Sequence, residues 1–400
     1  MSKKSKKSKK FSVKFRHKAV FFILKPLARI WIWLVYRFKP EIYGKLPSPC
    51  FVVSNHVTDC DMIMVPLSFT GTSHMYFVAG EHAMRAGFAS KLLQYFLDPI
   101  ARFKGTTATS TVLEMLRRMR AGASVALFPE GARSFSGETG YIFPATASLA
   151  RKSGVNLVTY RIEGGYLTAP RWAKGLRKGK MTGRVVGVYT PEQLKAMTDD
   201  EVFELITRDI HENAFDRQRS YAEPIKYKCA ETAKYIERAA IVCPRCKSVG
   251  TVKGEGSTVT CTCGMTAELD EYGFFHGDLP FETMAEWFSW QSEYMMSLPE
   301  CETETELCRN SALSLNLIDS DHNKVSVSTG DLVLTTEKIT VGDFSVPLAD
   351  IVSLDTYRHG YLLFTTADGK YYEIKGDGDY EGYKYYLFIK RYGKQTAAKQ

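Results

Sequence analysis

Two apolar runs that stop abruptly at ionisable residues constrain the fold of this chain more than any other feature. The first run, residues 51–54, ends two positions before His56, and the second run, residues 124–128, ends two positions before Glu130. Short β-branched runs of this kind are typical of buried strands that deliver a catalytic loop. In open α/β sheets the functional site lies beyond the carboxyl ends of the strands. We therefore expect His56 and Glu130 to meet at one edge of an α/β sheet.

The spacing of His56 and Asp61 suits a histidine that is held by a carboxylate. Four residues separate them, so a helix that begins near Thr58 would turn Asp61 back under the imidazole and hold one tautomer. The other ring nitrogen would then be free to act as a general base. Because no serine accompanies the pair, the nucleophile would be a hydroxyl group of the substrate.

The second run continues into a turn that carries charges of both signs. Pro129, Glu130 and Gly131 are followed closely by Arg133. A flexible turn that presents a carboxylate and a fixed cation suits the binding of a phosphorylated alcohol. Each half alone is a weak signal, but two such halves about seventy residues apart, each at a strand end, are specific.

Together the two halves resemble the motifs of the glycerolipid acyltransferases, the family typified by lysophosphatidic acid acyltransferase. Residues 55–61 resemble the first motif of that family, and residues 128–134 resemble the third. Residues 100–102 stand in the place of the second motif, and residues 154–160 in the place of the fourth. The resemblance extends over about residues 41–215.

The resemblance implies transfer of a fatty acyl group from a thioester of acyl carrier protein or coenzyme A to a lysophospholipid hydroxyl. The expected acceptor is 1-acylglycerol 3-phosphate, and the product would be phosphatidic acid. His56 would be the general base, oriented by Asp61, while Asn55 and backbone amides would stabilise the oxyanion. The residues expected to bind the acceptor are Arg102, Glu130, Gly131 and Arg133. No cofactor beyond the acyl donor is implied.

Several positions depart from the family pattern and leave the acceptor head group open. Thr58 stands where serine is usual, and Ala101 stands where an acidic residue is usual. Asn156 and Thr159 replace prolines of the fourth motif, and residues 144–147 offer no lysine after the third motif. Acylation of a different lysolipid is therefore an alternative.

The formal charge excess of the chain lies in its first 18 residues. This segment holds eight lysines and one arginine with no acid, which equals the net charge of +9. The next residues, 19–36, are apolar except for Lys25, Arg29 and one proline, and the cations share one helical stripe. We predict an interfacial helix over residues 19–40, bound to an anionic phospholipid surface at the cytoplasmic face of the cell membrane. A transmembrane span is disfavoured because the apolar run is interrupted.

Two close cysteine pairs predict a metal site. Cys243 and Cys246 form the first pair, and Cys261 and Cys263 follow after a stretch rich in Gly, Ser and Thr. This is the tetrahedral zinc pattern, although the second pair is one residue shorter than usual. Four thiolates leave no position open for water or substrate, so the zinc would be structural. Nine cysteines is an odd number, which disfavours a disulfide framework.

The chain divides by pattern into a tail, an anchor and several folded units. We expect an α/β acyltransferase domain over residues 41–220 and a small β-rich domain over residues 321–395. The units between them are a helical linker (221–240), a zinc ribbon (241–266) and a helical connector (267–320). Short strands capped by one C-terminal helix resemble the pleckstrin-homology (PH) and GRAM-like superfold.

Two other classes of function stay open at this point. The altered second and fourth motifs are compatible with a catalytically silent lipid-binding or scaffolding protein on the same fold. The lysine tail and the ribbon are compatible with a nucleic-acid-associated protein. Only Arg245, Lys247 and Lys253 lie near the cysteines, however, and stacked aromatic residues are lacking, which disfavours nucleic acid as a partner.

Overall fold

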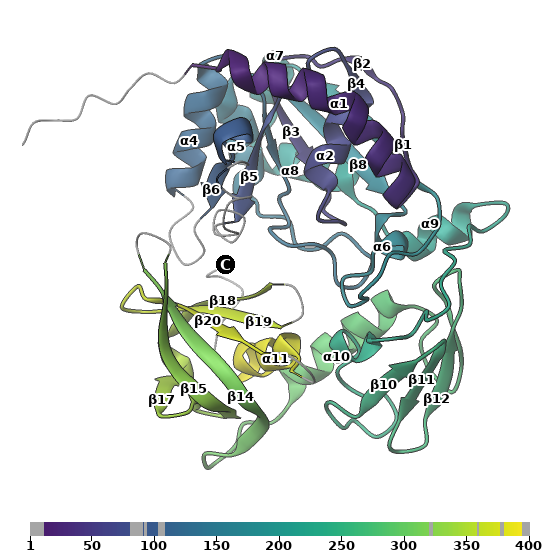
Figure 1. The fold of residues 1–400 in the computed structure, drawn as a ribbon, viewed down its shortest axis with the longest axis vertical. Coiled ribbons are helices and arrows are strands. Elements are labelled where there is room, and N and C mark those ends of the chain that lie inside the picture. The colour runs from purple at the N-terminus through teal and green to yellow at the C-terminus, as the bar shows by residue number, and fades with distance from the viewer. Residues whose placement is uncertain are drawn as a thin grey trace, which may run out of the picture.

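The computed structural model describes residues 12–80, 91, 94–102, 109–319, 323–357, 360–376 and 380–393. It contains an α/β unit with a seven-stranded sheet, a small four-stranded sheet and a second seven-stranded sheet. Figure 1 shows the α/β unit at the top, the four-stranded sheet at the lower right and the other sheet at the lower left. An α/β domain followed by two β-rich modules is therefore observed, while most of the predicted basic tail lies outside the described residues.

The α/β sheet has the strand order β1-β9-β8-β3-β7-β5-β6, and its neighbours are parallel except for the antiparallel pair β8 and β9. The strands are β1 (Phe38–Pro40), β3 (Cys50–Ser54), β5 (Tyr76–Gly80), β6 (Ile100–Arg102), β7 (Val125–Leu127), β8 (Asn156–Glu163) and β9 (Met181–Tyr189). A separate two-stranded sheet pairs β2 (Gly44–Lys45) with β4 (Phe69–Thr70). The two strands predicted from the apolar runs are confirmed as β3 and β7, and they are neighbours.

The register of β3 and β7 aligns the two motif loops. Val53 pairs with Leu127, so both strands end at the same edge of the sheet. All five residues of β3 are buried, and alternate side chains enter opposite cores. Val52 packs in the cluster that includes Ile32, whereas Phe51 and Val53 pack in the opposite cluster.

Helices cover both faces of this sheet. The first cluster is closed by α1 (Phe15–Tyr36), α2 (Asp61–Met64) and the 3₁₀ helix η1 (Val65–Ser68). The second is closed by α4 (Thr109–Arg120), α5 (Ala145–Ser153), α7 (Pro191–Ala196) and α8 (Asp199–Ile210). Two short helices, α6 (Gly165–Thr168) and α9 (Ala214–Ser220), belong to a third cluster that extends into the ribbon. The sheet is thus buried on both faces, as a parallel sheet requires.

Helix α1 begins at Phe15, earlier than predicted, and two of its cations point toward the protein. The Lys25 ammonium donates to the Phe69 carbonyl, to the Gly71 carbonyl (3.2 Å) and to the Ser73 hydroxyl (2.7 Å). Arg29 donates to the Leu67 carbonyl at 2.7 Å. These two cations of the predicted stripe therefore bind carbonyl groups of the η1–β4 segment and its continuation.

Residues 221–240 do not form the predicted helical linker. Apart from the 3₁₀ turn η3 (Ile236–Arg238), the segment is irregular, and Tyr235 has a left-handed φ of 71°. Ala233 donates from its amide to the Gly256 carbonyl at 2.8 Å, and the Thr232 hydroxyl donates to the Leu269 carbonyl. The segment is held by the ribbon, and these tertiary contacts override a weak helical preference.

The cysteine-containing module is larger than predicted. Its antiparallel sheet comprises β10 (Val252–Glu255), β11 (Thr258–Cys261), β12 (Thr266–Leu269) and β13 (Phe275–Gly277), so it continues past residue 266. Helix α10 (Met284–Ser297) follows and is the helical part of the predicted connector. The Trp287 indole donates to the Val242 carbonyl at 2.9 Å, and the buried Gln291 amide donates to Ala239 and accepts from Ile241. The helix is thereby fixed to the segment just before the first cysteine.

The C-terminal module is one antiparallel sheet with the order β17-β16-β15-β14-β20-β19-β18. Its strands are β14 (Glu306–Ile318), β15 (Lys324–Thr335), β16 (Lys338–Val341), β17 (Phe344–Pro347), β18 (Ile351–Tyr357), β19 (Tyr361–Thr366) and β20 (Tyr371–Lys375), with η4 (Leu348–Asp350) before β18. Helix α11 (Gly382–Tyr392) packs against β18 and β19. The module begins at β14 and not at the predicted residue 321. Its first strand is polar and half exposed, so its strand character is evident only from its pairing with β15 and β20.

Candidate active site

His56 and Asp61 form a hydrogen-bonded pair just beyond the end of β3. His56 Nδ1 lies 2.8 Å from Asp61 Oδ2, and the Asp61 side chain is fully buried. The carboxylate also accepts from the backbone amides of Val57 (2.7 Å) and Thr58 (3.0 Å) and from the Thr58 hydroxyl (2.6 Å). Helix α2 begins at Asp61 itself, later than expected, yet the loop still brings the carboxylate under the ring. The predicted pairing is present, and Thr58 supplies a hydroxyl where the family usually has serine.

The second imidazole nitrogen of His56 is available for chemistry. Nε2 makes no hydrogen bond within the part of the chain that the structure describes, and the side chain is partly exposed. The ring stacks on Phe128 at 4.6 Å between centroids, with planes 19° apart. Phe128 was not among the expected site residues, although its position directly before Pro129 and Glu130 at a strand end was a usable signal.

The Glu130 carboxylate holds the two motif loops together. Oε1 accepts from the His56 amide at 2.7 Å, and Oε2 accepts from the Gly140 amide at 2.6 Å. Burial raises the pKa of Glu130 to about 7, above that of an ordinary carboxyl group. Gly131 makes the tight turn that follows, with a φ of 71°. Each carboxylate oxygen accepts from the backbone amide of a different loop, so Glu130 joins the two loops in this geometry.

Asn55 is a bridge between strands. Its side-chain nitrogen donates to the Ile162 carbonyl at 2.8 Å, and its side-chain oxygen accepts from the Ile162 amide at 2.8 Å. The residue is only 1% exposed. The expected role in stabilising an oxyanion does not suit this geometry, because both polar atoms of the carboxamide already join the end of β3 to β8.

The two arginines expected to bind the acceptor come from different parts of the sheet edge. Arg133 lies beside the catalytic loop, where its Nε is 3.4 Å from the exposed Asp59 carboxylate. Arg102 ends β6, three strands from β3 in the sheet order, or about 14 Å at ordinary strand spacing. Burial lowers the pKa of Arg102 from its usual value. Both lie at the carboxyl edge of the sheet.

The departures in the fourth motif have structural roles. The Asn156 amide donates to the Pro47 carbonyl at 3.2 Å, at the end of β8 away from His56. The Thr159 hydroxyl donates to the buried Asp209 carboxylate at 2.8 Å. These residues support the sheet and do not line the catalytic edge.

Comparison with known proteins agrees with this geometry. Residues 39–163 match the family model described as Acyltransferase. The chain is 28% identical over 167 residues to the chloroplastic 1-acyl-sn-glycerol-3-phosphate acyltransferase BAT2 of Brassica napus, covering 41% of this chain and 48% of that protein. It is 28% identical over 166 residues to the chloroplastic 1-acyl-sn-glycerol-3-phosphate acyltransferase LPAT1 of Arabidopsis thaliana, covering 40% and 46%.

The chain thus spans about half the length of the curated relatives it matches. A solved structure, the 1-acyl-sn-glycerophosphate acyltransferase PlsC of Thermotoga maritima, aligns with a TM-score of 0.41 and 19% identity over 51% of this chain and 82% of that one. The resemblance inferred from the two motifs is confirmed for residues 39–163, which end with β8.

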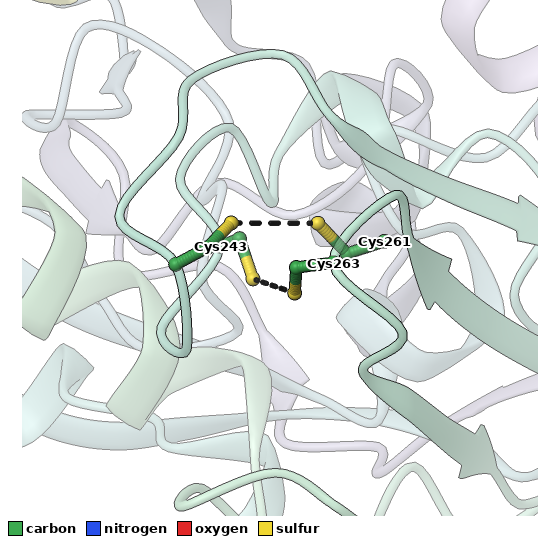
Figure 2. A group of neighbouring side chains, drawn as sticks. Cys243, Cys261 and Cys263 are labelled. Carbon is green, nitrogen blue, oxygen red and sulfur yellow. Dashed lines mark hydrogen bonds between the residues drawn. The ribbon is translucent and has the colours of Figure 1, made fainter.

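The four cysteines of the ribbon converge on one point (Figure 2). Their sulfur atoms all lie within 4.8 Å of one another, with Cys243 and Cys263 at 3.8 Å and Cys246 and Cys261 at 3.7 Å. Four thiolates at about 2.3 Å from a tetrahedral zinc ion would be about 3.8 Å apart. Each knuckle closes through a left-handed residue, Lys247 or Gly264. The residues present therefore fit a zinc ion.

The double role of Glu130 gives a test of the site geometry. Glu130→Gln keeps one acceptor oxygen but turns an NH₂ group toward the amide of His56 or of Gly140, so one backbone donor loses its partner. We expect a loss of about 1–3 kcal/mol in the free energy of unfolding, measured by chemical denaturation. Glu138→Gln, in the same loop but half exposed, is the matched control and should change stability by less than about 0.5 kcal/mol. Equal losses in both variants would contradict the assignment.

Proposed function

We propose that this protein is an O-acyltransferase that transfers a fatty acyl group from a thioester to the hydroxyl of a lysophospholipid. The observation that carries the proposal is the His56–Asp61 pair, with Nε2 open to substrate, inside a segment that matches the acyltransferase family model. The names of the aligned plant relatives favour 1-acylglycerol 3-phosphate as the acceptor, which would make phosphatidic acid. The donor is a thioester of acyl carrier protein or of coenzyme A.

The geometry supports a general-base mechanism. The acceptor hydroxyl would donate a hydrogen bond to His56 Nε2, and the imidazole would take its proton as the oxygen attacks the thioester carbonyl. Asp61 would stabilise the imidazolium through Nδ1. Collapse of the tetrahedral intermediate would expel the thiolate, which would take the proton from Nε2 and leave as a thiol. No acyl-enzyme intermediate is needed, and burial raises the pKa of the nearby Cys60 thiol, which makes it a poor nucleophile.

Arg133 is the best candidate for binding the acceptor phosphate. It follows the Glu130 turn, and its present partner, Asp59, is an exposed carboxylate at 3.4 Å. Such a surface pair is weak, so a phosphate dianion could displace the carboxylate at little cost. Arg102 would reach only a more distant part of the substrate. With Asn55 committed to Ile162, backbone amides remain as the candidates for stabilising the oxyanion.

The exposed face of α1 supports attachment to a membrane surface. The helix is long and apolar enough to cross a membrane by length and composition. Because Lys25 and Arg29 bind the protein body, the face turned away from it is a continuous apolar surface. Its exposed residues are Phe22, Ile23, Leu24, Leu27, Ile30, Trp31, Trp33 and Leu34. Because α1 packs along the α/β unit, we expect it to lie in the membrane–water interface and not to span the bilayer.

The same helix would bring the membrane to the catalytic loop. At its C-terminal end the Tyr36 hydroxyl donates to Cys60 Sγ at 3.3 Å, and Cys60 precedes Asp61. An acceptor could therefore keep its acyl chain among lipids while its hydroxyl reaches His56. With the basic segment that precedes α1, this arrangement favours an anionic leaflet at the cytoplasmic face.

The two appended modules have proposed supporting roles. The ribbon would hold one structural zinc ion through Cys243, Cys246, Cys261 and Cys263. The seven-stranded sheet capped by α11 supports the likeness to the PH and GRAM-like superfold. A catalytically silent lipid-binding protein is the second candidate, but the intact His56–Asp61 pair favours an enzyme.

Replacing His56 tests the chemistry. His56→Ala should lower the turnover of labelled acyl donor with a panel of lysolipids by about 10²–10⁴-fold, since residues 55–61 and 128–140 contain no other histidine. His211→Ala is the control, because this half-exposed histidine has no part in the proposed mechanism. Turnover near that of the unmodified chain in His56→Ala would refute the mechanism, and an inactive unmodified chain would favour the silent alternative.

Removing two thiolates tests the metal. Native mass spectrometry should find one zinc ion per chain, and Cys243→Ser with Cys246→Ser should abolish binding and lower the melting temperature. Cys229→Ser with Cys301→Ser changes two cysteines outside the cluster and should keep the metal. If the unmodified chain is isolated without metal and melts at the same temperature as this control, the four cysteines do not form a zinc site.

Membrane attachment is tested with vesicles. Leu27→Glu on α1 should weaken binding to anionic vesicles at least tenfold, because a buried leucine contributes about 2 kcal/mol. Leu113→Glu on α4 is matched in exposure, at 61% against 62%, and should change binding little. Equal effects of the two substitutions would show that the membrane-binding surface lies elsewhere.

A further inference from the structure

The loop that carries Arg133 leaves the α/β unit and enters a contact between three parts of the chain. Phe135, two residues after Arg133, stacks on Tyr383 of α11 with centroids 4.5 Å apart and lies 6.0 Å from Phe288 of α10. Phe288 and Tyr383 also stack on each other, at 5.6 Å. Phe135 therefore packs against both appended modules, one through α10 and the other through α11.

A buried arginine makes the polar part of the same contact. Arg171 is 6% exposed, and its Nη1 donates to the Arg133 carbonyl at 3.0 Å. Its Nη2 donates to the Thr356 carbonyl (3.0 Å) and hydroxyl (3.1 Å) in β18. The guanidinium also lies 3.8 Å from the centre of the Phe135 ring. One side chain thus ties the Arg133 loop to the C-terminal sheet.

This contact completes the support of Arg133. On its other side, the next residue, Ser134, donates from its amide to the His56 carbonyl at 3.0 Å. The backbone at Arg133 is therefore held from both directions, by the catalytic loop and by Arg171. A buried guanidinium is costly to desolvate, and an apolar side chain could fill the same space, so its hydrogen bonds specify one geometry more than they add stability.

We propose that Arg171 is a positioning residue that sets Arg133 for the acceptor, so that the ribbon, α10 and the C-terminal sheet complete the acceptor site of the acyltransferase domain. The inference rests on the proposed function, in which Arg133 binds the acceptor phosphate. Because Arg171 is buried and its guanidinium binds Arg133 and Thr356, its loss acts through the position of Arg133 and leaves the His56–Asp61 pair in place.

The kinetic test uses the full-length chain with lysophosphatidic acid and an acyl thioester. Arg171→Met removes the hydrogen bonds but keeps a long side chain, and it should raise the KM for the acceptor about tenfold, with kcat and the donor KM within about twofold. The matched control is Arg177→Met, since Arg177 is equally buried (3% exposed) but donates to the Thr232 carbonyl. This control should leave the acceptor KM unchanged.

A double mutant separates positioning from general loss of stability. In the Arg133→Ala background, adding Arg171→Met should cause no further rise in the acceptor KM, because the guanidinium that Arg171 positions is already absent. Independent, multiplicative effects would overturn the inference. Thr356→Val, which removes only one acceptor of Arg171, provides a milder variant that should move the acceptor KM in the same direction.

Amide hydrogen exchange gives a readout that needs no activity. Arg171→Met should speed exchange of the Ser134 and Gly140 amides at least tenfold, while Arg177→Met should not, with β3 amides as an internal reference. If the unmodified chain transfers no acyl group but exchange responds, the proposed function fails and the positioning contact stands. If the chain is active and neither exchange nor the acceptor KM responds to Arg171→Met, the inference is overturned.

Discussion

The buried Asp61 carboxylate is the interaction on which the rest of the candidate site depends. Among the described residues it has no lysine or arginine partner, and it is stabilised by the imidazole of His56, two backbone amides and the Thr58 hydroxyl. A charge removed from water needs such donors, so the loop can fold only with all of them turned toward the carboxylate. The same arrangement leaves the second ring nitrogen of His56 without a hydrogen bond among the described residues, on a side chain that is partly exposed.

The second motif loop depends on the first through backbone contacts. The parallel register of β3 and β7 brings the two loops to one edge, and Glu130 then joins them by accepting from the His56 and Gly140 amides. Glu130 thus joins the two loops, and Arg133, which follows it, is the residue that we propose to bind the acceptor phosphate. Arg171 and Phe135 connect the second motif loop to the appended modules, which lie outside the segment that matches the family model.

Local sequence patterns predict the structure correctly where local chemistry decides it, and incorrectly where contacts between distant segments decide it. The apolar runs of β3 and β7 and the cysteine pairs can be recognised in the sequence, because strands, turns and thiolate clusters have short-range signatures. The linker at residues 221–240 was predicted helical, but hydrogen bonds to the ribbon keep it irregular. Strand β14 lies in a polar stretch without a clear strand pattern, and its pairing with β15 and with the more distant β20 makes it a strand.

The sequence by itself determined which groups could do chemistry: a histidine and an aspartate at the distance that one short loop can close, a turn with a cation, and four thiols in two knuckles. Only the tertiary structure decided how the polar groups are shared among partners. It committed Asn55 to Ile162, Glu130 to two amides, and Lys25 and Arg29 to carbonyls of the protein body. The physical reason is that a polar side chain takes whichever unsatisfied partner burial brings within about 3 Å, and that partner usually comes from a segment remote in sequence.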